Sequence, residues 1–299
     1  MSEVFLTGAT GVLGRRTVPR LVADGHSVSA VARSDDKAAQ LRELGASPVA
    51  VDLLDAPAVQ AAVQGHEAVV HLATHIPTGA AAARKRSWAT NDALRKEAAA
   101  NLSAAAVAAG AGGYVQESIT FPDVAAGADW IDENADRGYF RGNRTTVDAE
   151  AAAATVTAAG GRGVALRFAM FMAPDSAHMQ DVVKMARRGL WGMFGADDDF
   201  VSFVDVDDAA AAVVAAVAAP AGVYNVAEPD PRRRGEHRAE LAAVVGRQRL
   251  RALPALAQRA GGQVVDSLAR SHRISSATFS EVAGWRPARN GIEGWGSVA

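Results

Sequence analysis

The chain opens with VFLTGATGVLG, residues 4–14, and this stretch decides its fold. The apolar run at residues 4–6 predicts a buried strand, and the segment rich in Gly and Thr predicts a tight turn. The apolar spacing over residues 12–24 predicts a helix. A strand that enters a glycine turn and then a helix presents free backbone N–H groups at the positive end of the helix dipole. We therefore expect a pyrophosphate, and with it a dinucleotide, to bind here.

Each glycine of this turn has its own physical role. Gly8 allows the tight turn, Gly11 lets a phosphate approach the backbone, and Gly14 lets the helix pack close to the strand. A glycine-rich turn without a ligand is the alternative, but the strand before it and the helix directly after it favour nucleotide binding. The contacts expected at this turn come from Gly8, Thr10, Gly11, Val12, Leu13 and Gly14.

Strand and helix patterns alternate strictly after this turn. Apolar runs predict strands at 27–32, 48–52, 68–74, 114–116 and 164–168, and helices are predicted at 36–44, 57–63, 88–109 and 144–159. This alternation is typical of the α/β class, with a doubly wound parallel sheet. Ligands of such sheets bind beyond the carboxyl ends of the strands.

The spacing T-G-x-x-G-x-x-G resembles the short-chain dehydrogenase/reductase family, in particular its extended and atypical, NAD-dependent epimerase/dehydratase-like members. The segments H-L-A-T (71–74), F-V-D-V-D-D (203–208) and G-W-R-P (284–287) carry the resemblance further along the chain. It implies a Rossmann dinucleotide-binding domain at 1–174, to which 201–227 returns. It also implies a smaller, mostly helical substrate-binding lobe formed by 175–200 and 228–299. Asp207 is expected to cap a helix over 209–218.

Arg33 indicates which nicotinamide cofactor binds. It directly follows the second predicted strand, where an acidic residue would accept hydrogen bonds from the ribose of NAD and an arginine suits the 2′-phosphate of NADP. NADP(H) is therefore favoured over NAD(H); the alternative is a solvated arginine at a strand end. The resemblance implies further cofactor contacts from Ser34, Asp52, Leu53, Leu72, Ala73, Thr74, Asn91, Phe168 and Met172.

The resemblance fails at the catalytic residues. The family uses a Tyr and, four residues later, a Lys on one helix to move the alcohol proton. Aligning that helix by the segment 149–151 puts Gly142 at the Tyr position and Thr146 at the Lys position, and neither can do this work. If Tyr139 is the phenol instead, Asn143 takes the Lys position and carries no charge.

Four residues remain as candidates for proton transfer. Tyr139 could reach the site from one helical turn away, or it could be an ordinary half-buried aromatic residue. Ser118 and Thr120 are candidates for the Ser that orients the substrate oxygen in the family. Glu117 could act as a displaced acid or base, and its pKa would rise if apolar side chains bury it.

Three functions are compatible with these residues. The first is an atypical NAD(P)-dependent oxidoreductase that reduces a ketone, or oxidises a secondary alcohol, on a small-molecule metabolite, with displaced proton-relay residues. The second is a redox-neutral isomerase, lyase or cyclase on the same scaffold. The third is a non-catalytic NADP sensor. The cofactor itself carries out hydride transfer, so the missing Tyr and Lys do not exclude the first function.

Composition restricts the partners and the location. The chain has 299 residues, is 49% hydrophobic, and has a net charge of −2, so no basic surface predicts nucleic-acid binding. It contains no cysteine, and no apolar run predicts a membrane span. The first strand begins almost at the first residue, and we expect a cytoplasmic protein, monomeric or homodimeric. His71 and His75 lie about 13 Å apart if both are on a strand, and no metal site is expected.

Overall fold

A parallel sheet of seven strands forms the centre of the protein. The computed structural model describes residues 2–124, 126–253 and 262–299, and the strand order is β10-β6-β5-β4-β1-β2-β3. Every neighbouring pair in this sheet is parallel, which confirms the predicted doubly wound α/β fold. The strands are β1 (Glu3–Thr7), β2 (Ser27–Val31), β3 (Ser47–Val49), β4 (Ala68–His71), β5 (Gly113–Ile119), β6 (Arg162–Phe168) and β10 (Gly222–Val226).

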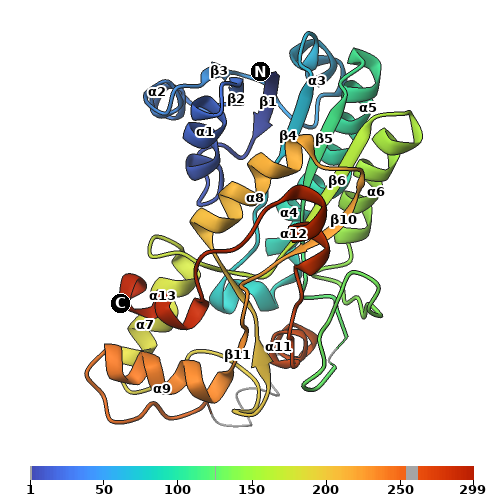
Figure 1. Ribbon diagram of the computed structural model, residues 1–299. Coiled ribbons are helices and arrows are strands. Elements are labelled where there is room, and N and C mark those ends of the chain that lie inside the picture. The colour runs from blue at the N-terminus through green and yellow to red at the C-terminus, as the bar shows by residue number, and fades with distance from the viewer. Residues whose placement is uncertain (1, 125, 254–261) are drawn as a thin grey trace.

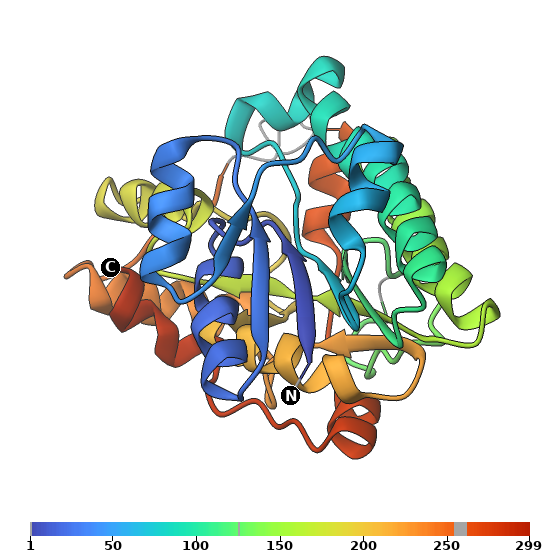
Figure 2. The same ribbon diagram turned by 90° about the horizontal axis from the view of Figure 1, so that it is seen from above.

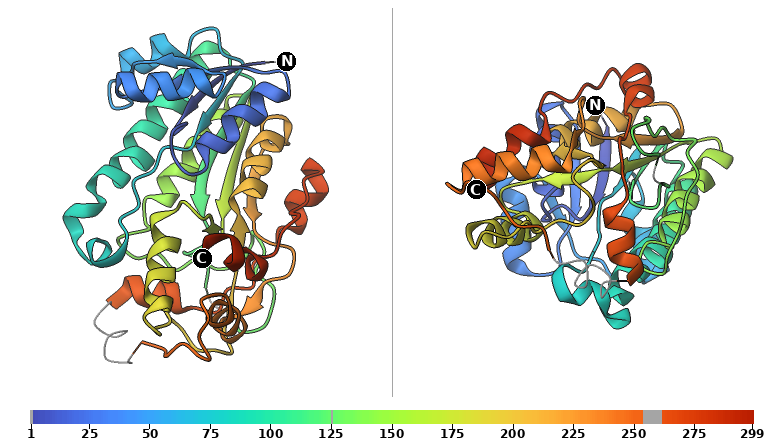
Figure 3. Two further views of the ribbon diagram at one scale, coloured as in Figure 1. Left: turned by 90° about the vertical axis from the view of Figure 1, so that its left-hand side faces the viewer. Right: turned by 90° about the horizontal axis from the view of Figure 1, so that it is seen from below.

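Helices cover both faces of the sheet, because successive side chains of each strand point to opposite faces. Val4 and Leu6 of β1 join one core with α1 (Gly14–Ala23) and α8 (Val206–Ala218). Phe5, between them, joins a second core on the opposite face with α3 (Ala56–Val63), α5 (Ala99–Ala109) and α6 (Thr146–Ala158). Figures 2 and 3 show these two layers of helices with the sheet between them. Helix α2 (Asp35–Glu43) connects β2 to β3.

The long helix expected at 88–109 is present in three parts. It consists of α4 (Ala89–Ala93), the π-helical turn η3 (Leu94–Ala98) and α5, which follow one another without a break. The connection before it contains the short 3₁₀ helices η1 (Gly79–Ala83) and η2 (Lys85–Trp88). Single π turns inside α-helices occur frequently at functional sites.

A smaller group of elements lies beyond the carboxyl ends of the strands, in the lower half of Figure 1. It contains α7 (Ala177–Arg187), α9 (Arg234–Val244), α11 (Gly262–Ala269), α13 (Gly291–Val298) and two short sheets. These sheets pair β7 (Met170–Met172) with β9 (Phe203–Asp205), and β8 (Phe200–Val201) with β11 (Arg232–Arg233). Trp295 is the centre of their core, with its ring 5.8 Å from that of Phe203 and 6.2 Å from that of Trp191.

Helix α12 (Ala277–Ala283) belongs to the predicted lobe in sequence but packs against the sheet. Its Phe279 lies 5.3 Å, between ring centroids, from Tyr224 of β10. The division of the chain into 1–174 with 201–227, and 175–200 with 228–299, stays a proposal. None of the helices in the described part of the chain combines the length and apolar character needed to cross a bilayer.

Aspartate side chains cap two of the helices. Asp55 caps α3, because its side chain accepts a hydrogen bond from Ala58 N. The prediction that Asp207 caps α8 is wrong: the helix begins earlier, and Asp205 is the cap, accepting from Asp207 N at 2.8 Å. The carboxylate of Asp207 instead pairs with Arg20 at 2.8 Å and thereby joins α8 to α1.

Candidate active site

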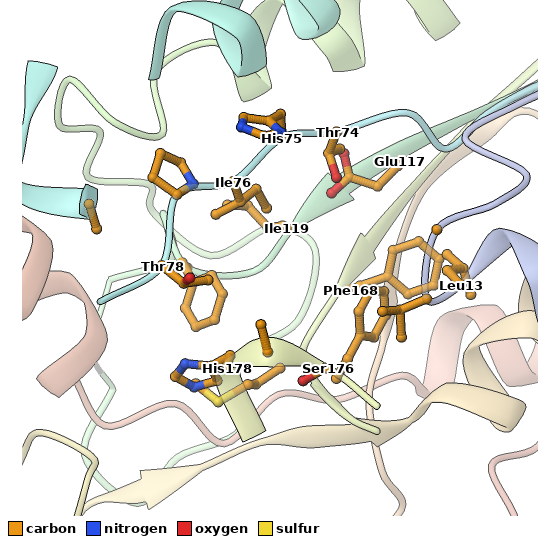
Figure 4. Close-up of a pocket in the computed structure, with 18 of the residues that line it drawn as sticks. Leu13, Thr74, His75, Ile76, Thr78, Glu117, Ile119, Phe168, Ser176 and His178 are labelled. Carbon is orange, nitrogen blue, oxygen red and sulfur yellow. The ribbon is translucent and has the colours of Figure 1, made fainter. Parts of the chain in front are cut away.

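One cavity of about 1000 Å³ lies at the carboxyl ends of the central strands. The glycine turn of residues 8–14 and Arg33 form one end of it, and at the other end Trp88, Phe140 and Phe194 contribute aromatic side chains. Figure 4 shows Leu13 and Phe168 at one side of the cavity and Thr78 and His178 at another. A nucleotide end and an apolar chamber are therefore parts of a single site.

The glycines of the turn have distinct structural roles. Gly8 has φ of +75°, and a Cβ there would lie 2.6 Å from Ala73 N; a Cβ on Gly14 would lie 2.2 Å from Gly8 O. Both positions therefore require glycine for the fold itself. Gly11 is exposed and lines the cavity, and the nearest atom to a Cβ there would be Gly8 O at 3.2 Å. A side chain at Gly11 would occupy the space through which a phosphate approaches.

The amino terminus of α1 is suited to an anion. Leu13 is its N-cap residue and supplies no side-chain hydrogen bond, and the first turn contains no acidic residue. The first N–H groups of a helix have no partner within the helix, and together with the helix dipole they favour a negative charge. The turn and helix thus fit the pyrophosphate of a dinucleotide, with the glycines providing room for it.

Of the residues expected near the adenosine, Arg33 and Leu53 line the cavity, and Lys37 joins them. Ser34 does not line it; its hydroxyl accepts from Lys37 N and caps α2. Asp52 does not line it either, because its Oδ1 accepts from Leu54 N at 3.0 Å. Arg33, at the end of β2, therefore faces the cavity, while Ser34 and Asp52 form hydrogen bonds within their own segments.

The remaining predicted cofactor contacts also divide into two groups. Leu72, Ala73, Thr74 and Phe168 line the cavity. Asn91 and Met172 do not line it. Asn91 is buried, and its Oδ1 accepts from His75 N at 3.0 Å. Met172 is buried in the core around Trp295.

Ser118 does not line the cavity. Strand β5 continues to Ile119 instead of ending at Gln116, so Ser118 lies within the strand and alternates with its cavity-lining neighbours Glu117 and Ile119. Its Oγ donates to Glu150 Oε1 at 2.7 Å.

Glu150 is the centre of a buried network of charges. Burial alone would raise its pKa, but the hydrogen bond from Arg167 and the charges of Arg137 and Arg167 outweigh this and hold the pKa below its usual value. Arg137 and Arg167 approach its two oxygens at 2.7 and 2.8 Å. The hydroxyl of Ser118 therefore serves this structural network.

Thr120 and Tyr139 also lie outside the cavity lining. Thr120 is buried, with its Oγ1 3.5 Å from Phe168 O. Tyr139 is 41% exposed, and the guanidinium of Arg137 lies 5.4 Å from the centre of its ring. The structure thus does not bring the predicted Ser, Thr and Tyr together at the cavity.

Glu117 is the predicted proton-transfer residue that does line the cavity, and Figure 4 shows it beside Thr74. It is buried, but apolar side chains alone do not surround it. Arg95, on the π turn η3, donates from Nη2 to both carboxylate oxygens at 2.8 and 3.1 Å and is itself fully buried. The sequence did not reveal this partner, because Arg95 lies 22 residues before Glu117, on another element.

The space expected for the catalytic phenol is filled by apolar rings. A Cβ on Gly142 would lie 2.7 Å from Phe140 Cε2 and 3.0 Å from Trp88 Cζ2. Thr146, at the Lys position, is buried and donates from its hydroxyl to Asn143 O at 2.7 Å. The described chain therefore has no Tyr–Lys pair at these positions, and the space for a tyrosine side chain at position 142 is already filled.

Two lining residues that the sequence did not single out as substrate contacts are Asn143 and His178. Burial lowers the pKa of His178, so its imidazole is neutral at neutral pH. The basic side chains among the described lining residues, Arg33 and Lys37, are both at the nucleotide end. The described lining of the chamber therefore offers apolar surface, uncharged polar groups and the carboxylates of Glu117 and Asp181, but no Arg or Lys side chain.

His71, the last residue of β4, forms hydrogen bonds through both of its ring nitrogens. Its Nε2 lies 3.1 Å from Leu94 O and donates to it, so its Nδ1 accepts from the hydroxyl of Thr7 at 2.6 Å. Burial lowers its pKa to about 4. Among the described residues, no group of three or more His, Asp or Glu side chains is placed to hold a metal ion.

Comparison with known proteins identifies the class. Residues 8–220 match the model of an NAD(P)H-binding family, and the chain belongs to this family. It is an atypical short-chain dehydrogenase/reductase or epimerase-like protein, and an NAD(P)-dependent oxidoreductase or epimerase-like enzyme.

Two curated relatives are similar to this chain in sequence, and two solved structures are similar to it in fold. The chain is 32% identical to a 3-diazoavenalumate denitrifying reductase of Streptomyces sp, over 95% of this chain and 96% of the relative. It is 29% identical to a 2-alkyl-3-oxoalkanoate reductase of Shewanella oneidensis, over 72% of this chain and 57% of the relative. The fold is similar to that of a UDP-glucose-4-epimerase from Stenotrophomonas maltophila with bound NAD (TM-score 0.79, 18% identity, 100% of this chain and 97% of the other). It is also similar to that of the human epimerase family protein SDR39U1 with NADPH (TM-score 0.78, 19% identity, 99% of each chain).

Proposed function

We propose that this protein is an NADPH-dependent reductase that transfers a hydride to an apolar, aromatic small molecule. The observation that carries this proposal is the single cavity, in which a pyrophosphate-binding turn is continuous with an apolar chamber. The described lining residues of the chamber include no Arg or Lys, the side chains that form charge-assisted hydrogen bonds with phosphates, so the chamber is less suited to a sugar nucleotide or another phosphorylated substrate. An apolar pocket with a few polar groups is typical of sites for small, poorly charged ligands.

The preference for NADPH over NADH rests on the end of β2. Arg33 and Lys37 both line the cavity there, and no acidic residue takes the position that would bind the ribose of NAD. A guanidinium can form charge-assisted hydrogen bonds with a 2′-phosphate.

The chemistry divides between the cofactor and the chain. When bound, the cofactor supplies the hydride. The chain binds the pyrophosphate at the α1 terminus, excludes water with the rings of Trp88 and Phe140, and offers Glu117 at the chamber wall. Excluding water protects the hydride donor from side reactions and strengthens every polar interaction in the site.

A ketone is the first candidate for the reduced group. Its reduction needs a proton for the alkoxide oxygen, and of the predicted proton-transfer residues only Glu117 lines the cavity. Tyr139→Phe and Ser118→Ala should therefore keep near-native turnover, because neither side chain reaches the chamber. The name of the Shewanella relative, an oxoalkanoate reductase, supports this candidate.

A diazonium group is the second candidate, and the pairing of Glu117 with Arg95 favours it. The guanidinium donates to both carboxylate oxygens of Glu117, so both oxygens already act as hydrogen-bond acceptors. Hydride addition to a diazonium carbon needs no proton: R–N₂⁺ and H⁻ give R–H and N₂. The name of the Streptomyces relative, a diazo-compound denitrifying reductase, supports this candidate.

The test is to incubate the purified protein with NADPH and either acetophenone or a benzenediazonium salt, while following NADPH oxidation and N₂ release. The Gly11→Val variant serves as the background control, because it should fold but not bind the nucleotide. Enzyme-dependent NADPH oxidation with either probe supports the proposal. Product formation without net NADPH oxidation would favour a redox-neutral isomerase, lyase or cyclase. NADPH binding without turnover of either probe, or of a wider panel of apolar ketones, would favour a sensor.

A further inference from the structure

Asn143 carries a buried donor that no atom of the described chain accepts. The residue is 2% exposed and lines the cavity, and its Nδ2 has no hydrogen-bond partner. Native proteins pair nearly all buried polar atoms, so each exception calls for an explanation such as a ligand. The chamber that Asn143 lines is the place where a ligand would supply the acceptor.

The orientation of this amide is fixed by its own segment. Oδ1 accepts from Phe140 N at 2.9 Å, and the backbone oxygen of Asn143 accepts from Thr146 Oγ1 at 2.7 Å. A flipped amide would place the NH₂ group against the Phe140 N–H, donor against donor, so Oδ1 must be the atom that faces the backbone. The NH₂ group is therefore the part of the amide left available for the cavity.

The neighbours of Asn143 place it in the chamber and not at the nucleotide turn. Phe140 forms part of the same short segment and lines the chamber, and its ring and that of Trp88 fill the space beside Gly142. Of the other polar groups near the chamber, the hydroxyl of Ser176 accepts from Met179 N and that of Ser267 donates to Phe121 O, whereas Nε2 of His178 is also without a partner in the described chain. An uncharged donor in apolar surroundings suits a neutral acceptor, such as a carbonyl oxygen.

We propose that Asn143 Nδ2 donates a hydrogen bond to an acceptor atom of the substrate and so positions it in the chamber. This inference rests on the proposed function for its substrate class, an aromatic molecule that carries a neutral acceptor. It makes Asn143 a positioning residue that selects substrates with such an acceptor over isosteric molecules that lack one.

Binding of two matched probes tests the inference without requiring turnover. Acetophenone has a carbonyl oxygen, and α-methylstyrene replaces it with CH₂ at nearly the same shape. Their affinities are measured by calorimetry with the protein saturated with NADP⁺. A neutral hydrogen bond corresponds to a preference of about 3- to 10-fold, so the native protein should bind acetophenone more tightly by that factor.

Asn143→Asp keeps the oxygen that accepts from Phe140 N and removes the donor, so the preference for acetophenone should disappear. Asn143→Leu removes both groups and should lose the preference together with some thermal stability. Asn225→Asp is the matched control, since Asn225 is fully buried on β10 and does not line the cavity; its preference should equal that of the native protein.

The outcomes separate this inference from the proposed function. A native-like preference in Asn143→Asp would overturn the role of Asn143 even if the protein reduces one of the probes. Weaker NADP⁺ binding in Asn143→Asp with an unchanged preference would also overturn it, by assigning the donor to the cofactor. Loss of the preference in Asn143→Asp, with native NADP⁺ affinity, supports the inference even if NADPH is never oxidised.

Discussion

The buried pair of Arg95 and Glu117 allows the most demanding prediction from this structure. Arg95 is fully buried, and its Nε and Nη1 have no partner in the described chain. The two hydrogen bonds from its Nη2 to Glu117 therefore have to offset the cost of burying its charge. Removing one member of a buried ion pair leaves an uncompensated charge and costs about 3–5 kcal/mol. We therefore expect Glu117→Leu to lower the free energy of unfolding by that amount.

The double variant Arg95→Met/Glu117→Leu supplies the contrast. Replacing a whole buried ion pair with apolar side chains is often neutral or stabilising by about 1–4 kcal/mol. Its free energy of unfolding should therefore return to at least the native value. Urea unfolding followed by circular dichroism, with linear extrapolation, measures all three proteins. A Glu117→Leu protein within about 1 kcal/mol of the native one would refute the reasoning, because Arg95 would then have another source of compensation.

The same double variant separates the two candidate reactions. It is expected to fold, and it lacks the Glu117 carboxylate at the chamber wall. Loss of a general acid or base costs about 10²–10⁴ in kcat, and we expect a loss of this size if the substrate is a ketone. With a diazonium substrate, which needs no proton, kcat should stay within about one order of magnitude of the native value.

Three further predictions concern the cofactor and the pH dependence of stability. Arg33→Asp should weaken NADPH binding by ~1.5–3 kcal/mol in calorimetry. Arg42→Asp, which makes the same charge change on the exposed part of α2, should leave NADPH binding unaltered. Tighter binding of NADH than of NADPH by the native protein would contradict the preference for NADPH. Gly11→Val should abolish NADPH binding and leave the circular dichroism spectrum and thermal midpoint close to native, so retained affinity in the folded variant would exclude this turn as the site. Burial lowers the pKa of His237 to about 3, and its Nδ1 accepts from Trp295 Nε1. A base whose pKa is lowered by folding stabilises the protein fully above its unfolded pKa of about 6.5, and this stability is lost as the pH falls toward 3. His237→Gln should therefore reduce the slope of the unfolding free energy against pH between these two values, by at most about 1.4 kcal/mol per pH unit.

The parts of the site that follow from local sequence were predictable. The glycine turn, the strand before it and the helix after it are adjacent in the chain, and their spacing alone defines the conformation. Arg33 was predictable in the same way, because the end of a parallel strand places it at the ligand-binding edge of the sheet. The parallel sheet followed from the alternation of elements.

The catalytic predictions depended on details that local sequence does not contain. Residues 117–119 extend β5 because they pair with 166–168 of β6, and a strand that continues assigns successive side chains to opposite faces. Ser118 is thereby turned away from the cavity that Glu117 lines. The Arg95 partner of Glu117 lies 22 residues earlier in the chain, on another element, so no periodic pattern connects the two.

The filled space beside Gly142 was equally hidden from the sequence. A missing Tyr can be read from one position, but the rings that occupy its place come from Phe140 and Trp88, which are far apart in the chain. The donor of Asn143 becomes visible only when its oxygen is seen to be occupied by Phe140 N. Tertiary contacts of this kind decide the chemistry of the chamber, whereas the sequence pattern decides its scaffold.

The most direct test of the central claim is deuterium transfer from NADPH labelled at C4 of the nicotinamide. The protein is incubated with each label position in turn and with the probe that supports NADPH oxidation, and the product is analysed by mass spectrometry. We predict that one of the two C4 positions transfers its deuterium to the carbon that is reduced, with one NADPH oxidised for each product molecule. A product that forms without deuterium from either position, and without NADPH oxidation, would contradict the account.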